Sequence, residues 1–207
     1  MLKRIIFDID NNLMGFPKDY YIYFNQVLKK YNINITAKML YEIIGKYETC
    51  GKYTFYDKRL LLDHINKELQ LNLDKRFLDD FFNLYNNLIS PISNLTINTL
   101  NYLHSKYELV TLSNWFTESQ ELRLKRAGIF NYFDKIYGTD LVPMKPYYDS
   151  YLSVMESRKA CECLMVGDNI EMDIKTPDIM GMKVYYLGRK KTSYPTIDTL
   201  ERLKEML

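Results

Sequence analysis

The pattern of hydrophobic and polar positions changes twice along the chain. Residues 4–9 form a short run of β-branched and aromatic side chains that ends in acidic and amide residues, which predicts a buried strand. After Pro17 the apolar residues recur at three- and four-residue spacing, which is typical of helices. These helices are expected at about 20–31, 37–46, 58–68 and 74–89. No strand pattern interrupts this stretch.

From about residue 96 the pattern alternates between helix and strand. Helices are predicted at 96–105, 117–127, 146–157, 170–180 and 197–206, and strands at 107–113, 134–138, 162–167 and 182–187. Such alternation predicts βαβ units with right-handed crossovers. The expected fold class is α/β, with a Rossmann-like parallel sheet and an inserted α-helical cap domain. The predicted core domain comprises residues 1–14 and 96–207, and the predicted cap residues 15–95.

Composition narrows the class of protein further. The chain has 207 residues, 47% of them hydrophobic, which suffices for one domain with an insertion or for two small domains. Its 28 basic and 26 acidic side chains leave a net charge of +2, so neither nucleic acid nor an anionic membrane is an expected partner. No apolar stretch approaches the roughly 18 to 20 residues that span a bilayer. Three cysteines are too few for a disulfide scaffold. We expect a cytoplasmic monomer or homodimer.

Polar side chains gather where the predicted strands end. In an open α/β sheet the ligand crevice lies beyond the carboxyl ends of the strands. The side chains expected at that edge are Asp8, Asp10, Ser113, Asn114, Lys145, Asp168 and Asp173. Each of them alone is more often a turn residue, a helix cap or a solvated charge. Their joint placement at successive strand ends is what a purely structural interpretation does not explain. Close carboxylates repel unless a cation lies between them, and hard oxygen ligands favour magnesium.

The segments that carry these side chains resemble a known family. Residues 5–13, 112–114, 145–146 and 166–173 resemble the four ordered motifs of the haloacid dehalogenase superfamily of phosphohydrolases. The resemblance covers essentially the whole chain and includes the helical cap between the first two motifs. Residues 113–134 are similar to the 5′-nucleotidase branch, which acts on pyrimidine nucleoside monophosphates.

The sequence departs from the family pattern at three places. It has Asn12 where relatives usually have Thr or Val, Trp115 in place of a common Gly, and Thr176-Pro177 where relatives often have Gly-Ala. A proline at 177 would kink the helix if that helix begins at Ile170. An Asn amide at position 12 can still donate and accept hydrogen bonds, so we expect altered efficiency rather than abolished chemistry.

The resemblance implies a role for each residue. Asp8 would attack phosphorus and form an aspartyl-phosphate, while Asp10 would protonate the leaving alcohol and then activate water. Ser113 and Lys145 are also expected to be catalytic. The implied phosphate-binding groups are Ile9, Asn12, Ser113, Asn114 and Lys145. The implied Mg²⁺ ligands are Asp8, the backbone carbonyl of Asp10, and Asp168. Asn169 and Asp173 would lie beside them, with Asp173 orienting Lys145 or a metal-bound water.

The predicted function is magnesium-dependent hydrolysis of a small phosphorylated metabolite, with a nucleoside 5′-monophosphate favoured over a sugar phosphate or phosphoglycolate. Aromatic residues that could stack on a base are Phe16, Tyr20, Tyr21, Tyr47, Tyr53, Phe55 and Tyr56, although aromatic residues at helical spacing are more often core.

Three alternatives remain. A haloacid dehalogenase would lack the second aspartate and the metal, so Asp10 and Asp168 argue against it. A noncatalytic binding protein on the same scaffold draws its support from Asn12. Serine, cysteine or zinc hydrolysis is disfavoured because neither His64 nor His104 follows a predicted strand.

Overall fold

The computed structural model describes residues 1–17, 19–49 and 54–207. These residues form two compact units, a core unit of residues 1–16 and 90–207 and a helical unit of residues 17–89. The chain therefore passes between the units after residues 16 and 89, and not after the predicted residues 14 and 95. A hydrogen bond from Gly15 N to Pro91 O, at 3.1 Å, joins the two crossing segments within the core unit.

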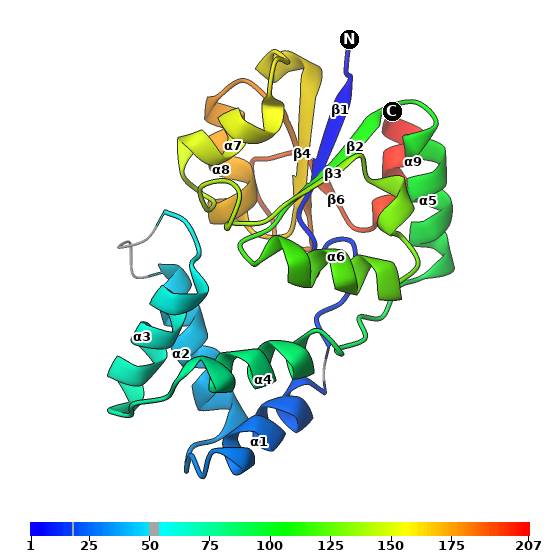
Figure 1. The fold of residues 1–207 in the computed structure, drawn as a ribbon. Coiled ribbons are helices and arrows are strands. Elements are labelled where there is room, and N and C mark those ends of the chain that lie inside the picture. Colours follow the sequence, from blue (N-terminus) through cyan, green and yellow to red (C-terminus); the bar gives the residue numbers. More distant parts are fainter. Residues whose placement is uncertain (18, 50–53) are drawn as a thin grey trace. The chain divides into compact units, whose positions relative to one another are not determined.

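The core unit is built on a six-stranded parallel sheet of order β3-β2-β1-β4-β5-β6 (Figure 1). The strands are β1 (Arg4–Phe7), β2 (Glu108–Leu112), β3 (Lys135–Tyr137), β4 (Cys163–Gly167), β5 (Lys183–Leu187) and β6 (Thr196–Ile197). In the centre of the sheet, Ile6 of β1 is in register with Val110 of β2 and with Met165 of β4. The predicted α/β class with a Rossmann-like parallel sheet is confirmed.

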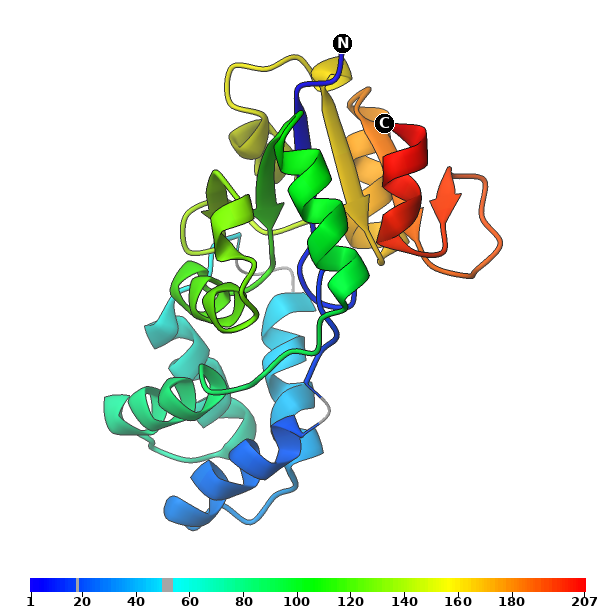
Figure 2. The ribbon, with the colours of Figure 1, turned by 90° about the vertical axis from the view of Figure 1, so that its right-hand side faces the viewer.

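Helices cover both faces of this sheet (Figures 1 and 2). They are α5 (Asn94–His104), α6 (Thr117–Arg126), α7 (Tyr148–Met155), α8 (Lys175–Ile179) and α9 (Leu203–Met206). Successive strand residues point to opposite faces, so Ile5 packs in one cluster with Leu103 of α5, whereas Ile6 packs in the other with Val154 of α7. Because both faces are buried, only the ends of the strands remain for a site.

Two of the predicted helices differ from the observed structure. The helix expected at 197–206 is preceded by β6, which pairs with Tyr186 and Leu187 of β5, and it forms only over a 3₁₀ turn at Leu200–Arg202 and α9. The helix expected at 170–180 is divided into a π turn at Ile170–Ile174 and α8. Pro177 therefore lies in the first turn of α8, where its missing N–H is not needed.

The helical unit contains α1 (Tyr20–Lys30), α2 (Ala37–Thr49), α3 (Lys58–Leu69) and α4 (Lys75–Tyr85), all four of which match predicted segments. Its core is strongly aromatic, with the rings of Phe24 and Phe81 5.2 Å apart. Tyr47 and Tyr56, two of the candidates for base stacking, are buried against each other with ring centroids 5.1 Å apart, so they are core residues. Tyr53, another candidate, lies outside the described residues.

Within the described part of the chain, no helix combines the length and the apolar character required to cross a membrane.

Candidate active site

The loop after β1 delivers the first two aspartates. The strand ends at Phe7, two residues earlier than predicted, and the chain then turns tightly because the amides of Leu13 and Met14 both donate to Ile9 O at 3.0 and 3.2 Å. Asn11 has a φ of 57°, in the left-handed region that asparagine tolerates better than most residues. This turn places Asp8 and Asp10 at the carboxyl edge of the sheet.

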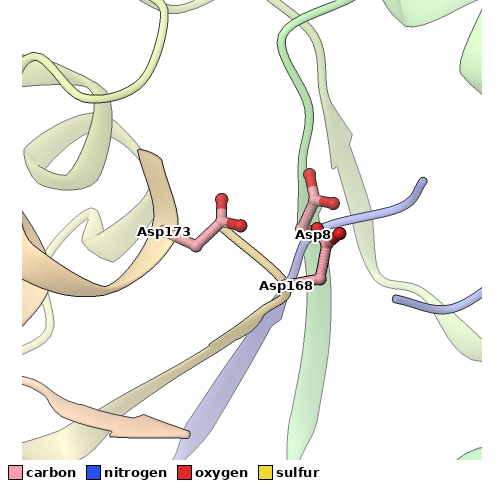
Figure 3. A group of neighbouring side chains, drawn as sticks. All are labelled: Asp8, Asp168 and Asp173. Atoms are coloured by element: carbon pink, nitrogen blue, oxygen red, sulfur yellow. The ribbon is translucent and has the colours of Figure 1, made fainter. Parts of the chain in front are cut away.

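Three carboxylates meet at this edge. One oxygen atom from each of Asp8, Asp168 and Asp173 lies within 4.8 Å of the others (Figure 3). Asp8 and Asp168 follow neighbouring strands, and Asp173 reaches toward them from the π turn after β4. Gly167 makes this approach possible, since a Cβ there would lie 2.4 Å from Asp173 Oδ2. The structure thus brings together three of the predicted site residues.

Lys145 supplies a cation to this cluster. Its ammonium lies 2.6 Å from Asp8 Oδ1 and 2.6 Å from Asp173 Oδ1, and the residue is only 3% exposed. The side chain of Asn114 holds the backbone of Lys145 through two hydrogen bonds, accepting from its N–H at 2.8 Å and donating to its carbonyl at 2.9 Å. The sequence predicts a phosphate contact for Asn114 but not this positioning of Lys145. Asp173 contacts the Lys145 ammonium directly.

Asp10 is hydrogen-bonded to side chains of α6. Arg123 Nη2 donates to Asp10 Oδ1 at 2.6 Å, and Arg123 Nη1 donates to Oδ2 at 3.0 Å. Gln120 Nε2 also donates to Oδ2, at 3.2 Å. Neither Arg123 nor Gln120 is among the predicted site residues. The available signal was their three-residue spacing on a predicted helix directly after Ser113, which places both on one helix face.

Ser113 is connected to the same helix. Its buried hydroxyl oxygen accepts a hydrogen bond from Gln120 Nε2 at 2.7 Å. A serine hydroxyl carries one donor as well as acceptor lone pairs, so the proton of Ser113 remains available for a ligand oxygen. The geometry is compatible with the expected phosphate contact.

The side chains of Asn12 and Asn169 both bond to backbone groups beside the carboxylate cluster. Asn12 is buried, and its amide nitrogen donates to Asp8 O at 2.8 Å and to Val166 O at 3.0 Å. Both amide hydrogens are thereby directed to the ends of β1 and β4, so this geometry offers no donor to a phosphate. Asn169 accepts from the backbone amides of the π turn that follows it, at 3.0 and 3.2 Å. It therefore caps that turn. Ile9 is fully buried in the core, which leaves only its backbone for a ligand.

Burial and like charge shift the pKa values of the clustered groups. Burial raises the pKa of Asp8 to about 8, with Lys145 opposing the shift and Asp173 adding to it. Burial also raises the pKa of Asp168 to about 6, and Asp173 contributes in the same direction. Burial lowers the pKa of Lys145, but its two carboxylate partners outweigh this effect and raise it overall. One ammonium is therefore not enough to keep all of these carboxylates ionised.

The residues present fit a hard divalent cation. Four carboxylates and two cations share this end of the core unit, namely Asp8, Asp10, Asp168, Asp173, Lys145 and Arg123. When all four carboxylates are ionised, these groups carry two negative charges in excess, and a divalent ion would offset them. All the ionised donors are oxygens, the ligand type of magnesium. Because Asp173 is already bonded to Lys145 and to the amide of Asn169, Asp8 and Asp168 are the side chains best placed to hold the ion.

The core is a parallel α/β sheet that is interrupted after β1 by a helical insertion. Aspartates, a serine and a lysine lie at its strand ends, an arrangement typical of hydrolases. The chain belongs to the haloacid dehalogenase-like hydrolase family, whose sequence model matches residues 5–187.

Relatives and solved structures agree with this assignment. The chain is 25% identical to the pyrimidine 5′-nucleotidase YjjG of Escherichia coli, over 98% of this chain and 96% of that protein. It is 26% identical to a glyceraldehyde 3-phosphate phosphatase of Methanothermobacter thermautotrophicus, over the whole of both chains. The structure of the putative hydrolase YfnB of Bacillus subtilis, bound to magnesium, superposes with a TM-score of 0.75 at 20% identity, covering 100% of this chain and 98% of that one.

Proposed function

We propose that the protein is a magnesium-dependent phosphate monoester hydrolase that acts through an aspartyl-phosphate. The observation that carries the proposal is the cluster in which Lys145 bridges Asp8 and Asp173 with Asp168 beside them. An anionic nucleophile can approach an anionic phosphate only where positive charge compensates both. When bound, magnesium supplies the further positive charge that this cluster lacks.

The first step forms a bond between Asp8 and phosphorus. Lys145 donates to Asp8 Oδ1, and among the described residues Oδ2 has no hydrogen-bond donor, so Oδ2 is the oxygen that attacks. The P–O bond to the leaving alcohol breaks, and Asp10 gives that alcohol its proton. Ser113 and Lys145 donate to the phosphoryl oxygens, on which negative charge develops in the transition state.

The second step releases the phosphate. Asp10, now a carboxylate, accepts a proton from water as the water oxygen attacks phosphorus. The bond to Asp8 breaks, which returns the Asp8 carboxylate and yields inorganic phosphate. Asp10 holds the proton again and is ready for the next ester. Protons and charge therefore balance over the two steps.

Phosphate monoesters are favoured over the alternative substrates. Haloacid dehalogenases of this family use an aspartate nucleophile without the second aspartate and the metal, whereas Asp10 and Asp168 are both present here. The nucleotidase and the glyceraldehyde 3-phosphate phosphatase among the relatives both support a small phosphorylated metabolite. The similarity of residues 113–134 to the 5′-nucleotidase branch favours a nucleoside 5′-monophosphate over a sugar phosphate. Asn12, the support for a noncatalytic role, fixes the two strand ends that carry Asp8 and Asp168, which is compatible with catalysis.

The test is hydrolysis of para-nitrophenyl phosphate by the purified protein. We expect turnover with magnesium, none in EDTA, and a loss of several orders of magnitude in Asp8→Asn, which cannot form the acyl phosphate. The matched control is Asp149→Asn, which removes an exposed carboxylate from α7 and should leave the rate unchanged. Turnover in Asp8→Asn, or none in the folded wild type with magnesium, would contradict the proposal.

A substrate panel would then rank the candidates. UMP, dUMP, dTMP, phosphoglycolate and hexose phosphates should be compared by kcat/KM. The highest value for a nucleotide would support a nucleotidase, and the highest value for a hexose phosphate or phosphoglycolate would move the assignment to those esters.

A further inference from the structure

Helix α6 buries a polar face. Gln120 and Arg123, three residues apart, are 0% and 1% exposed. Burying a guanidinium is costly unless it is paired and hydrogen-bonded, and ordinary helix packing would place apolar side chains here. The polar face therefore needs an explanation beyond packing.

Arg123 holds Asp10 by both carboxylate oxygens. The side chain of Asp10 is 28% exposed, so without a partner it would be free to change rotamer, whereas the side chain of Arg123 is fully buried. The same guanidinium donates to Ser90 Oγ at 2.7 Å and to Gln120 Oε1 at 3.0 Å. It also lies 5.9 Å from the ring centroid of Phe16. These contacts fix the position from which Arg123 presents its two N–H groups to Asp10.

Gln120 connects Asp10 to Ser113, and its orientation follows from chemistry. Arg123 only donates hydrogen bonds, so the amide oxygen of Gln120 must face Arg123. The amide nitrogen then faces Asp10 Oδ2 and Ser113 Oγ, at 3.2 and 2.7 Å. The Gln120 amide thus bonds both the Asp10 carboxylate and the Ser113 hydroxyl. Because Ser113 Oγ accepts this bond, its own proton points away from Gln120.

We propose that Arg123 and Gln120 are positioning residues that hold Asp10 for proton transfer to the leaving alcohol, in fixed relation to Ser113. This inference rests on the proposed phosphatase function. In the described residues, Asp10 Oδ1 accepts a hydrogen bond from Arg123 alone, whereas Oδ2 accepts two.

The test compares two phosphate esters with different leaving groups. An alkyl ester such as glycerol phosphate expels a poor leaving group that needs the proton, whereas para-nitrophenyl phosphate expels a stabilised phenolate that needs it little. Because kcat/KM reports the steps up to departure of the alcohol, Arg123→Lys and Gln120→Met should lower kcat/KM for the alkyl ester about 10-fold more than for the aryl ester. Arg123→Lys keeps the charge but cannot bond both oxygens of Asp10 in a fork.

Two controls separate positioning from general structural damage. Lys125→Met removes an exposed cation of the same helix, paired with Glu121, and should change neither ester. Asp10→Asn should also lower kcat/KM more for the alkyl ester than for the aryl ester, and the ratio of the two losses should be larger than in Arg123→Lys. In the Asp10→Asn background, Arg123→Lys should add no further selectivity, because Arg123 acts through Asp10. Urea unfolding of each variant verifies that it is folded.

The outcomes distinguish this inference from the proposed function. Equal losses for the two esters in folded Arg123→Lys and Gln120→Met, or no loss in either variant, would overturn the positioning role and leave the phosphatase intact. Absence of turnover of both esters by the wild type with magnesium would instead overturn the proposed function, and this inference with it.

Discussion

Lys145 Nζ and Asp8 Oδ1 lie 2.6 Å apart, although 137 residues separate them in the chain. Both are buried, and the ammonium also touches Asp173. The pair therefore combines two demands. The ammonium offsets the charge of Asp8, and the two carboxylates in turn make burial of the ammonium tolerable.

Removing Lys145 should affect activity and stability together. In Lys145→Met we expect a loss of about 2.7–4 kcal/mol of transition-state stabilisation, by analogy with a lost oxyanion donor. The free energy of unfolding should fall by about 3–5 kcal/mol, because Asp8 and Asp173 lose their buried partner. Steady-state kinetics and urea denaturation would measure the two effects. The matched control is Lys175→Met, in an exposed pair with Glu171, for which a comparable loss would argue against a special role of Lys145.

The metal-free protein should become less stable as the pH rises from 5 to 8. The pKa values of Asp8 and Asp168 are raised to about 8 and about 6, against about 3.9 in the unfolded chain. The folded state therefore retains protons that the unfolded state has lost, and the stability present below about pH 4 declines as the pH rises through the folded values.

Urea midpoints in EDTA would measure this decline. Magnesium should remove most of it by favouring the ionised carboxylates, and Asp8→Asn should weaken it. A urea midpoint in EDTA that rises between pH 5 and pH 8 would show that folding does not raise the pKa values of these two carboxylates.

Asn12 should matter for stability more than for phosphate binding. In Asn12→Ala the carbonyl of Asp8 loses its donor, at a cost of about 1–3 kcal/mol, whereas Val166 O keeps the backbone amide of Asp8 as a donor at 3.0 Å. Asn12→Thr restores one donor and should recover part of the loss. Urea denaturation measures the effect, and KM for the ester should change little. A large rise in KM with unchanged stability would point instead to a direct phosphate contact.

Arg4 tests the opposite end of the sheet. It is fully buried at the start of β1, where it bonds Glu108 and Glu156 and the carbonyl of Val154. Arg4→Met should lower the free energy of unfolding by about 1–3 kcal/mol, since Val154 O loses its donor while the two glutamates keep Arg158 as a partner. The activity of the folded fraction should remain at the wild-type value. A selective fall in kcat would show that this network reaches the strand ends that carry the site.

Most of the fold can be predicted from the sequence because the helical spacing and the short β-branched runs of the strands are both pronounced. The β-branched run of β1 and the three- and four-residue spacing in α1 to α4 each lead to the observed element. β6 was missed because two residues cannot show an alternating pattern. The division of the helix after β4 was anticipated only as a kink at Pro177, because hydrophobic spacing does not distinguish a π turn from an α-helix.

The site was predictable where it depends on strand ends and not where it depends on side-chain pairing. Asp8 and Asp168 follow from the topology of a parallel sheet. The ion pair of Asp10 with Arg123 spans 113 residues, and no local pattern in the sequence assigns a partner to either charge. The bonds from the Asn114 side chain to the backbone of Lys145 could not be predicted either, because no local pattern pairs these two residues.

The position of β1 in the sheet has a consequence for synthesis of the protein. β1 leaves the ribosome first, yet both of its neighbours, β2 and β4, begin more than a hundred residues later, at Glu108 and Cys163. At roughly 5–20 residues per second, the apolar segment Ile5–Phe7 waits several seconds without a partner strand. Arg4 and Asp8 flank it with opposite charges, and flanking charges of this kind oppose aggregation of an exposed strand. On this principle, the charges of Arg4 and Asp8 would serve the nascent chain before either side chain has its final partner.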